Sequence, residues 1–135
     1  MNEKTHILNL KNTHFVDPIG FDHDEHYSSA YDLAMLTKYA LRFSEFRNIV
    51  KIKEAKITST NGVIEHSFKT TNNLLYSYLD IQGVKTGTTD AAGESLINLA
   101  KNDYGNEIIS VLLDSPNRFQ ENKSLIDWTF RAYSW

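Results

Sequence analysis

The sequence has 135 residues, a length typical of one domain or of a piece of a larger one. Hydrophobic residues make up 41% and charged residues 23%, which excludes a disordered chain and allows a packed core. The formal net charge is −3, from 14 Lys and Arg against 17 Asp and Glu, so no basic excess favours nucleic acid as a partner. The chain has no cysteine, which excludes disulfides, thiolate nucleophiles and cysteine-based zinc sites.

The N-terminal residues do not have the pattern of a secretory leader. Residues 1–6 lack a cationic start, and the apolar stretch after them is too short for a signal peptide. The longest apolar run, within residues 108–113, is far too short to span a bilayer. We therefore expect a soluble chain, cytoplasmic if it is expressed as written.

Two helices are predicted in the first fifty residues. Residues 1–27 are rich in His, Asp and Asn with turn formers at 17–20, and they predict a loop-rich entry. A helix should follow, capped by Ser28 or Ser29, because apolar residues recur at near-helical spacing over 30–41. Ser44-Glu45 favours a short second helix through Val50.

Strand patterns dominate the middle of the chain. Residues 55–60 and 63–69 flank Asn61-Gly62, which predicts a hairpin whose two turn residues both have positive φ. Residues 72–76 predict a helical turn or a short helix, and residues 83–88 predict a short strand.

The last third predicts a second hairpin and a closing helix. Its strands are 94–101 and 107–113, around a turn at 102–106. The segment 118–133 suits an amphipathic helix packed on the sheet through its apolar residues, Phe119, Leu125, Ile126, Trp128 and Phe130. The order of elements predicts an α+β fold with a largely antiparallel sheet, and we treat residues 1–135 as one unit.

Lys85-Thr86-Gly87 is the first pattern that could carry chemistry. A strand with a cation, a hydroxyl and a glycine can hold an extended peptide, because Gly87 removes the side chain that would block pairing at the strand edge. A surface strand that ends in a glycine turn would contain the same triplet. The triplet alone leaves both interpretations open.

Residues 83–93 read Gly-Val-Lys-Thr-Gly-Thr-Thr-Asp-Ala-Ala-Gly, and residues 9–18 read Asn-Leu-Lys-Asn-Thr-His-Phe-Val-Asp-Pro. With the further segments 20–22, 26–34, 71–75, 118–119 and 128–130, they resemble the low-molecular-mass penicillin-binding proteins, the serine D-alanyl-D-alanine carboxypeptidases of bacterial cell walls. The resemblance covers nearly the whole chain in the family's order. It implies a partial penicillin-binding-protein or β-lactamase-like fold, with an antiparallel sheet and packed helices.

The family uses three motifs, Ser-x-x-Lys, Ser-x-Asn and Lys-Thr-Gly, and only the third is in place here. No serine has lysine three positions on. Ser59-Thr60-Asn61 and Ser115-Pro116-Asn117 match Ser-x-Asn formally, but the family's motif precedes the segment at 9–18. The chain therefore resembles the C-terminal half of the catalytic domain, with the N-terminal half and its nucleophile missing.

The resemblance assigns roles to five residues. Lys85 would support proton transfer at the nucleophile and attract the substrate carboxylate, and Thr86 would hydrogen-bond that carboxylate. Gly87 would keep the strand edge open, and the Thr88 N–H would supply one oxyanion-hole donor. Arg118 would grip the terminal D-alanine carboxylate, a task suited to a guanidinium, although a solvated arginine at a helix start is the alternative.

A cluster of histidines and carboxylates in the first loop suggests a possible metal site. His23-x-x-His26 with the acids at 22, 24 and 25 could bind zinc. We favour a solvated loop, because the family pattern explains His26 as part of a helix entry, and we assign no metal and no cofactor. The family often has His where Ile19 stands, which weakens a role for this loop.

Two functions follow from these patterns. The first is a serine-type carboxypeptidase that acts on peptidoglycan stem peptides and binds β-lactams, with this chain inactive alone. The second is a non-catalytic module that forms a homodimer or pairs with a complementary N-terminal half. The family is extracytoplasmic and associated with the cell envelope.

Overall fold

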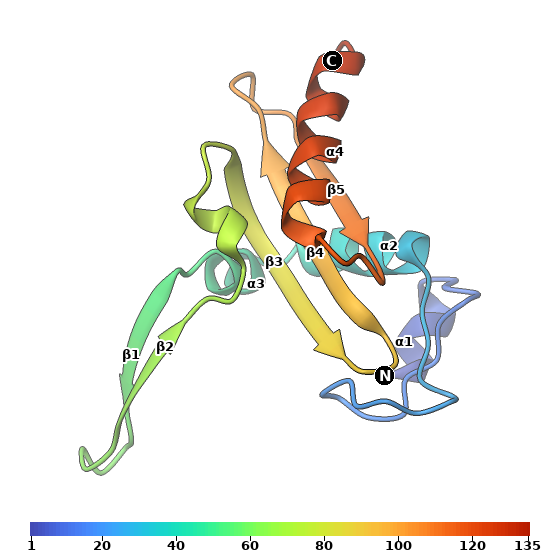
Figure 1. The fold of residues 1–135 in the computed structure, drawn as a ribbon. Coiled ribbons are helices and arrows are strands. Elements are labelled where there is room, and N and C mark those ends of the chain that lie inside the picture. The colour runs from blue at the N-terminus through green and yellow to red at the C-terminus, as the bar shows by residue number, and fades with distance from the viewer.

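The computed structural model describes residues 1–135 as a small helix-and-sheet fold (Figure 1). The α+β class predicted from the sequence is confirmed. In chain order the elements are α1 (Asn2–Ile7), α2 (Ala30–Ala40), α3 (Ser44–Val50), β1 (Glu54–Thr58), β2 (Glu65–Lys69), the 3₁₀ turn η1 (Asn73–Tyr76), β3 (Asp80–Thr89), β4 (Gly93–Lys101), β5 (Glu107–Leu112) and α4 (Arg118–Ala132).

The main sheet has three antiparallel strands in the order β3-β4-β5. In Figure 1, α4 lies in front of this sheet and α2 crosses behind it. Helix α4 packs on β4 and β5, α2 on β5, and α3 on β3. The sheet is therefore a central layer between helices, with β3 and β5 as its two end strands.

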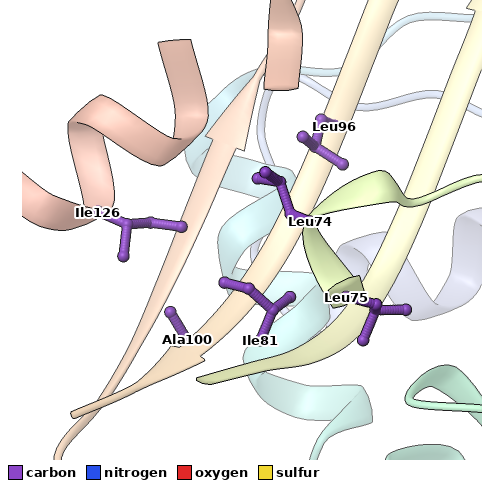
Figure 2. Packing of buried hydrophobic residues seen from close by; sticks show 6 residues of the cluster. All are labelled: Leu74, Leu75, Ile81, Leu96, Ala100 and Ile126. Atoms are coloured by element: carbon purple, nitrogen blue, oxygen red, sulfur yellow. The ribbon is translucent and has the colours of Figure 1, made fainter. Parts of the chain in front are cut away.

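The hydrophobic core fills the space between the sheet, η1 and α4 (Figure 2). Its buried members are Leu74, Leu75, Ile81, Leu96, Ala100 and Ile126. The predicted apolar stripe of α4 is only partly correct. Ile126 is buried and Phe119 and Phe130 pack against the core, but Leu125 is 37% and Trp128 56% exposed. A sheet of three strands covers only a narrow face of the helix, which leaves these two side chains in solvent.

The loop-rich entry predicted for residues 1–27 is wrong at its start, where residues 2–7 form α1. The Asn2 side chain holds this helix against a distant segment, because its amide both donates to the Phe15 carbonyl and accepts from the Phe15 N–H, each at 2.9 Å. A helix of 6 residues is too short to be stable through its own propensity. This tertiary contact is absent from the local sequence pattern.

Strands β1 and β2 form a hairpin that projects away from the main sheet (Figure 1). The hairpin is as predicted, but its turn is not. Gly62 has a φ of +74°, whereas Asn61 does not have positive φ. The Ser59 N–H bonds the Ile64 carbonyl at 2.8 Å, so four residues form the loop, and the Asn61 side chain accepts from the Val63 N–H at 3.2 Å. This side-chain bond stabilises the turn without two left-handed residues.

The helix at α2 begins as predicted, because the Ser29 hydroxyl accepts a hydrogen bond from the Asp32 N–H at 3.2 Å. The predicted second hairpin, the short helix α3 and the helical turn η1 are also confirmed. None of the helices combines the length and apolar character needed to cross a membrane.

Candidate functional site

Lys85, Thr86, Gly87 and Thr88 lie on β3, an end strand of the main sheet. On one side, β3 pairs with β4, with Gly87 opposite Ser95 and Thr88 opposite Glu94. No strand lies along the other edge of β3. A free strand edge can pair through its backbone with an extended peptide.

Gly87 leaves space at the surface of this strand. A Cβ atom built on Gly87 would have no other heavy atom within 4 Å, and the residue is exposed. This open space has two causes: glycine has no side chain, and no neighbouring segment packs against this position. A ligand can therefore approach the β3 backbone closely at this point.

The structure brings Arg118, the first residue of α4, to the same place. Its Nη1 donates to the Gly87 carbonyl and to the Thr88 hydroxyl, both at 2.6 Å. Its Nε lies 3.7 Å from Glu94 Oε2, and the side chain is only 12% exposed. The guanidinium therefore connects the start of α4 to β3 and β4, which excludes a freely solvated arginine.

Two cations flank the Thr86 position. Lys85 is exposed, and its Nζ donates to the Thr86 carbonyl. The hydrogen bonds of Arg118 all come from Nη1, while its Nε is buried without a hydrogen-bond partner. Guanidinium and ammonium groups along one stretch of a strand favour the binding of a carboxylate.

Thr71 is a member of this site that sequence reasoning missed. Its hydroxyl oxygen lies 2.6 Å from the hydroxyl oxygen of Thr86. The residue belongs to a segment that resembles the family, but no local pattern gave it a role. Only the fold joins two threonines that are 15 residues apart.

A chain of buried amides lies beneath the site. Asn72 Nδ2 donates to Asn98 Oδ1 at 2.7 Å, and Asn98 Nδ2 donates to Asn122 Oδ1 at 2.9 Å. The Ser110 hydroxyl also donates to Asn122 Oδ1, at 2.8 Å. These residues link the segment before η1 with β4, β5 and α4. The sequence signal was a single polar residue inside each of two apolar strands.

The first loop reaches the turn at the end of β3. Asp22 Oδ2 accepts a hydrogen bond from the Ala91 N–H at 3.3 Å. Within the loop, backbone hydrogen bonds led by that of Gly20 hold the pKa of Asp17 below its usual range. Ile19, at the position where the family often has His, is exposed.

The two histidines of the candidate zinc cluster have separate contacts. His23 Nδ1 accepts from the Glu25 N–H at 3.1 Å, and His26 Nδ1 lies 3.7 Å from Asp17 Oδ2. No three His, Asp or Glu side chains of the chain are arranged to hold a metal ion.

Two other features lie apart from the β3 site. A hollow of about 170 Å³ is lined by Ser44, Arg47, Asn48, Lys51, Gln82 and Leu99, of which only Leu99 is hydrophobic. The formal Ser-x-Asn matches also lie elsewhere: Ser59 is in the hairpin turn, and Ser115 is buried and donates to Glu121. Neither serine contacts Lys85 or Thr86 through a hydrogen bond.

The family described as D-alanyl-D-alanine carboxypeptidase matches residues 1–117, which include the whole of β3. The D-alanyl-D-alanine carboxypeptidase DacA of Escherichia coli K12 is 35% identical over 98% of the chain, which spans 32% of that relative. The D-alanyl-D-alanine carboxypeptidase DacF of Bacillus subtilis is 33% identical over 98% of the chain and 34% of the relative.

Solved structures show the same similarity in three dimensions. The Streptomyces K15 DD-transpeptidase has a TM-score of 0.89 at 31% identity, over 96% of this chain and 52% of that chain. Penicillin-binding protein 5 of Haemophilus influenzae has a TM-score of 0.85 at 31% identity, over 96% and 38%. The chain therefore spans about a third of the curated relatives and about half of the Streptomyces structure.

Proposed function

The chain belongs to the D-alanyl-D-alanine carboxypeptidase family, and from that premise we propose that it forms the β3 side of a site for the C-terminal D-alanine of peptidoglycan stem peptides. The placement of Arg118 carries the proposal. Two hydrogen bonds of 2.6 Å hold its guanidinium against Gly87 and Thr88, next to Lys85 and Thr86. The contact of Arg118 with this part of β3 supports a shared role of residues from β3 and α4 in binding one carboxylate.

In the proposed complex, the peptide lies along the free edge of β3 and pairs with its backbone. The peptide carboxylate accepts hydrogen bonds from the Thr86 hydroxyl and the Arg118 guanidinium, and the Lys85 ammonium attracts it. The Thr88 N–H stabilises the oxyanion that forms when the peptide carbonyl is attacked. A β-lactam that carries a carboxylate would bind the same groups.

Cleavage also requires a nucleophile and its base, which the Ser-x-x-Lys motif provides in this family. The sequence has no such motif. We therefore propose that the chain alone binds the peptide weakly without cleaving it, and that a polypeptide with the serine and lysine completes the site. Weak binding is expected because one wall can bury little of a ligand's surface.

The test of peptide binding is a titration of the ¹⁵N-labelled chain with N-acetyl-D-alanyl-D-alanine, followed by NMR. Shifts should centre on residues 85–88 and should weaken in Arg118→Met, while the C-terminal amide of the same dipeptide should bind less. The matched control is Arg131→Met, an exposed arginine near the end of α4. Shifts elsewhere, or equal binding by the amide, would contradict the proposal.

The test of catalysis is incubation with a fluorescent penicillin and denaturing electrophoresis. The pure chain should give no covalent band, because penicillin acylates the serine that this sequence lacks. A band should appear on a complementary polypeptide with Ser-x-x-Lys when the two are mixed. A covalent band on the pure chain would show a nucleophile outside the family's motif.

A second candidate is a non-catalytic module that associates through its sheet, which the free edge of β5 favours. Strand β5 pairs only with β4, and no hydrogen bond from another segment reaches its backbone. Its sequence, Glu-Ile-Ile-Ser-Val-Leu, has neither proline nor lysine to discourage pairing with another strand. The same edge would also accept a strand of a complementary half.

A further inference from the structure

The hydroxyls of Thr71 and Thr86 form an isolated pair beside the β3 edge. Their oxygens lie 2.6 Å apart, and each makes this one side-chain hydrogen bond within the chain. Thr71 follows β2, whereas Thr86 is the middle residue of Lys85-Thr86-Gly87 on β3. The pair thus connects the base of the hairpin to the strand that faces the ligand.

The pair has two possible arrangements of protons, because each hydroxyl has one proton to donate. If Thr86 donates to Thr71, it can offer only lone pairs to a carboxylate, which repels them. If Thr71 donates to Thr86, the Thr86 proton remains free for the carboxylate. Hydrogen bonds in such a series also polarise one another, which strengthens the outer bond. A bound carboxylate therefore selects Thr71 as the donor.

Backbone and side-chain contacts on both sides hold Thr71 in place. Before it, the Thr70 N–H bonds the Lys53 carbonyl at 2.8 Å. After it, the buried Asn72 donates to Asn98 at 2.7 Å and accepts from the Leu74 N–H at 3.2 Å. Thr71 is exposed, but its two neighbours fix the backbone from which its hydroxyl extends.

We propose that Thr71 is a positioning residue that orients the Thr86 hydroxyl, so that Thr86 donates its proton to the carboxylate of the ligand. This inference rests on the proposed function for the identity of the ligand. The contact between Thr71 and Thr86 does not depend on the proposed function. Thr71 acts through Thr86 and need not touch the peptide.

The first experiment measures the χ1 rotamer of Thr86 without ligand, from three-bond couplings of its methyl carbon to backbone nitrogen and carbonyl carbon. One rotamer is expected in the natural chain and in Thr71→Ser, which keeps the hydroxyl. Rotamer averaging is expected in Thr71→Val. The control is Thr58→Val, at an exposed strand position without a side-chain hydrogen bond. Averaging in the natural chain, or one unchanged rotamer in Thr71→Val, overturns the proposal.

The second experiment titrates the same variants with N-acetyl-D-alanyl-D-alanine and with its C-terminal amide. Thr71→Val should bind the acid about five-fold more weakly, the effect of one hydrogen bond, and Thr71→Ser should restore binding. Binding of the amide should not change. Equal affinity of Thr71→Val and the natural chain for the acid overturns the proposal. If the rotamers behave as expected and the natural chain does not bind the acid, positioning by Thr71 is supported and the proposed function fails.

Discussion

Arg47 and Glu107 form a two-pronged ion pair between α3 and the start of β5. Nη1 and Nη2 of the arginine each lie 2.9 Å from one carboxylate oxygen of the glutamate, across 60 residues of sequence. Arg47 Nε also donates to the Leu41 carbonyl at 2.6 Å. One guanidinium therefore connects the end of α2, helix α3 and the sheet.

This pair predicts a pH dependence of stability. The hydrogen bond from Arg47 lowers the pKa of Glu107. A lowered pKa in the folded state means that the carboxylate stabilises the fold at neutral pH, and that this stabilisation is lost as the pH falls below about 4. The side chains are 40% and 36% exposed, so solvent screening limits the contribution to about 1 kcal/mol or less.

The measurement is urea unfolding of the natural chain and of Glu107→Gln, near neutral pH and near pH 3. The natural chain should be the more stable at neutral pH, and the difference should shrink in acid. Glu25→Gln, at an exposed loop position, is the control. A difference that stays constant with pH would show that Glu107 acts by packing and not by charge.

The buried amide chain predicts a large loss of stability in Asn98→Leu. Asn98 is 0% exposed and uses both ends of its amide, on Asn72 and Asn122. Leucine would leave the buried Asn72 Nδ2 without an acceptor and would remove one of the two donors to Asn122 Oδ1. A buried polar group left unsatisfied costs about 1–3 kcal/mol. Asn48→Leu, on the exposed side of α3, should change the free energy of unfolding much less. Equal effects of the two substitutions would exclude a structural role for the chain of amides.

Substitution of Gly87 should affect peptide binding and not stability, whereas substitution of Gly93 should affect stability. Gly87 has open space around its Cα, so Gly87→Val should fold normally and should block the peptide at the β3 edge. Gly93 has a φ of +63°, and a Cβ there would collide with the Asp114 carboxylate. Gly93→Ala should therefore reduce the free energy of unfolding by about 1 kcal/mol or more. Urea unfolding and the peptide titration together separate the two effects; undiminished peptide binding by Gly87→Val would count against the site.

The free edge of β5 predicts self-association. Pairing of two such edges that buries about 500 Å² of apolar surface would gain about 12 kcal/mol before the costs of association. Sedimentation across a dilution series should show a dimer or larger species. Leu113→Lys, directly after this strand, should weaken association, and Tyr104→Lys, in the exposed β4–β5 turn, should not. A monomer at every concentration would show that the chain's own segments protect the edge.

Local patterns in the sequence were sufficient for most of the secondary structure. Ser29 begins α2 as expected because its hydroxyl bonds a backbone N–H three residues away, a contact that needs no other element. Alternating residue types predict the strand with Lys85-Thr86-Gly87 and the second hairpin, and apolar residues at helical spacing predict α4. The resemblance on residues 83–93 likewise led to the family that the comparisons confirm.

The tertiary structure alone decided which of these residues meet. Helix α1 depends on a contact between Asn2 and Phe15, and the environment of Arg118 depends on how α4 packs across β3 and β4. Thr71 meets Thr86 because the buried Asn72 anchors the segment between the hairpin and η1. Propensity and spacing describe residues a few positions apart, whereas these contacts arise from packing between distant segments, so their partners could not be predicted from the sequence alone.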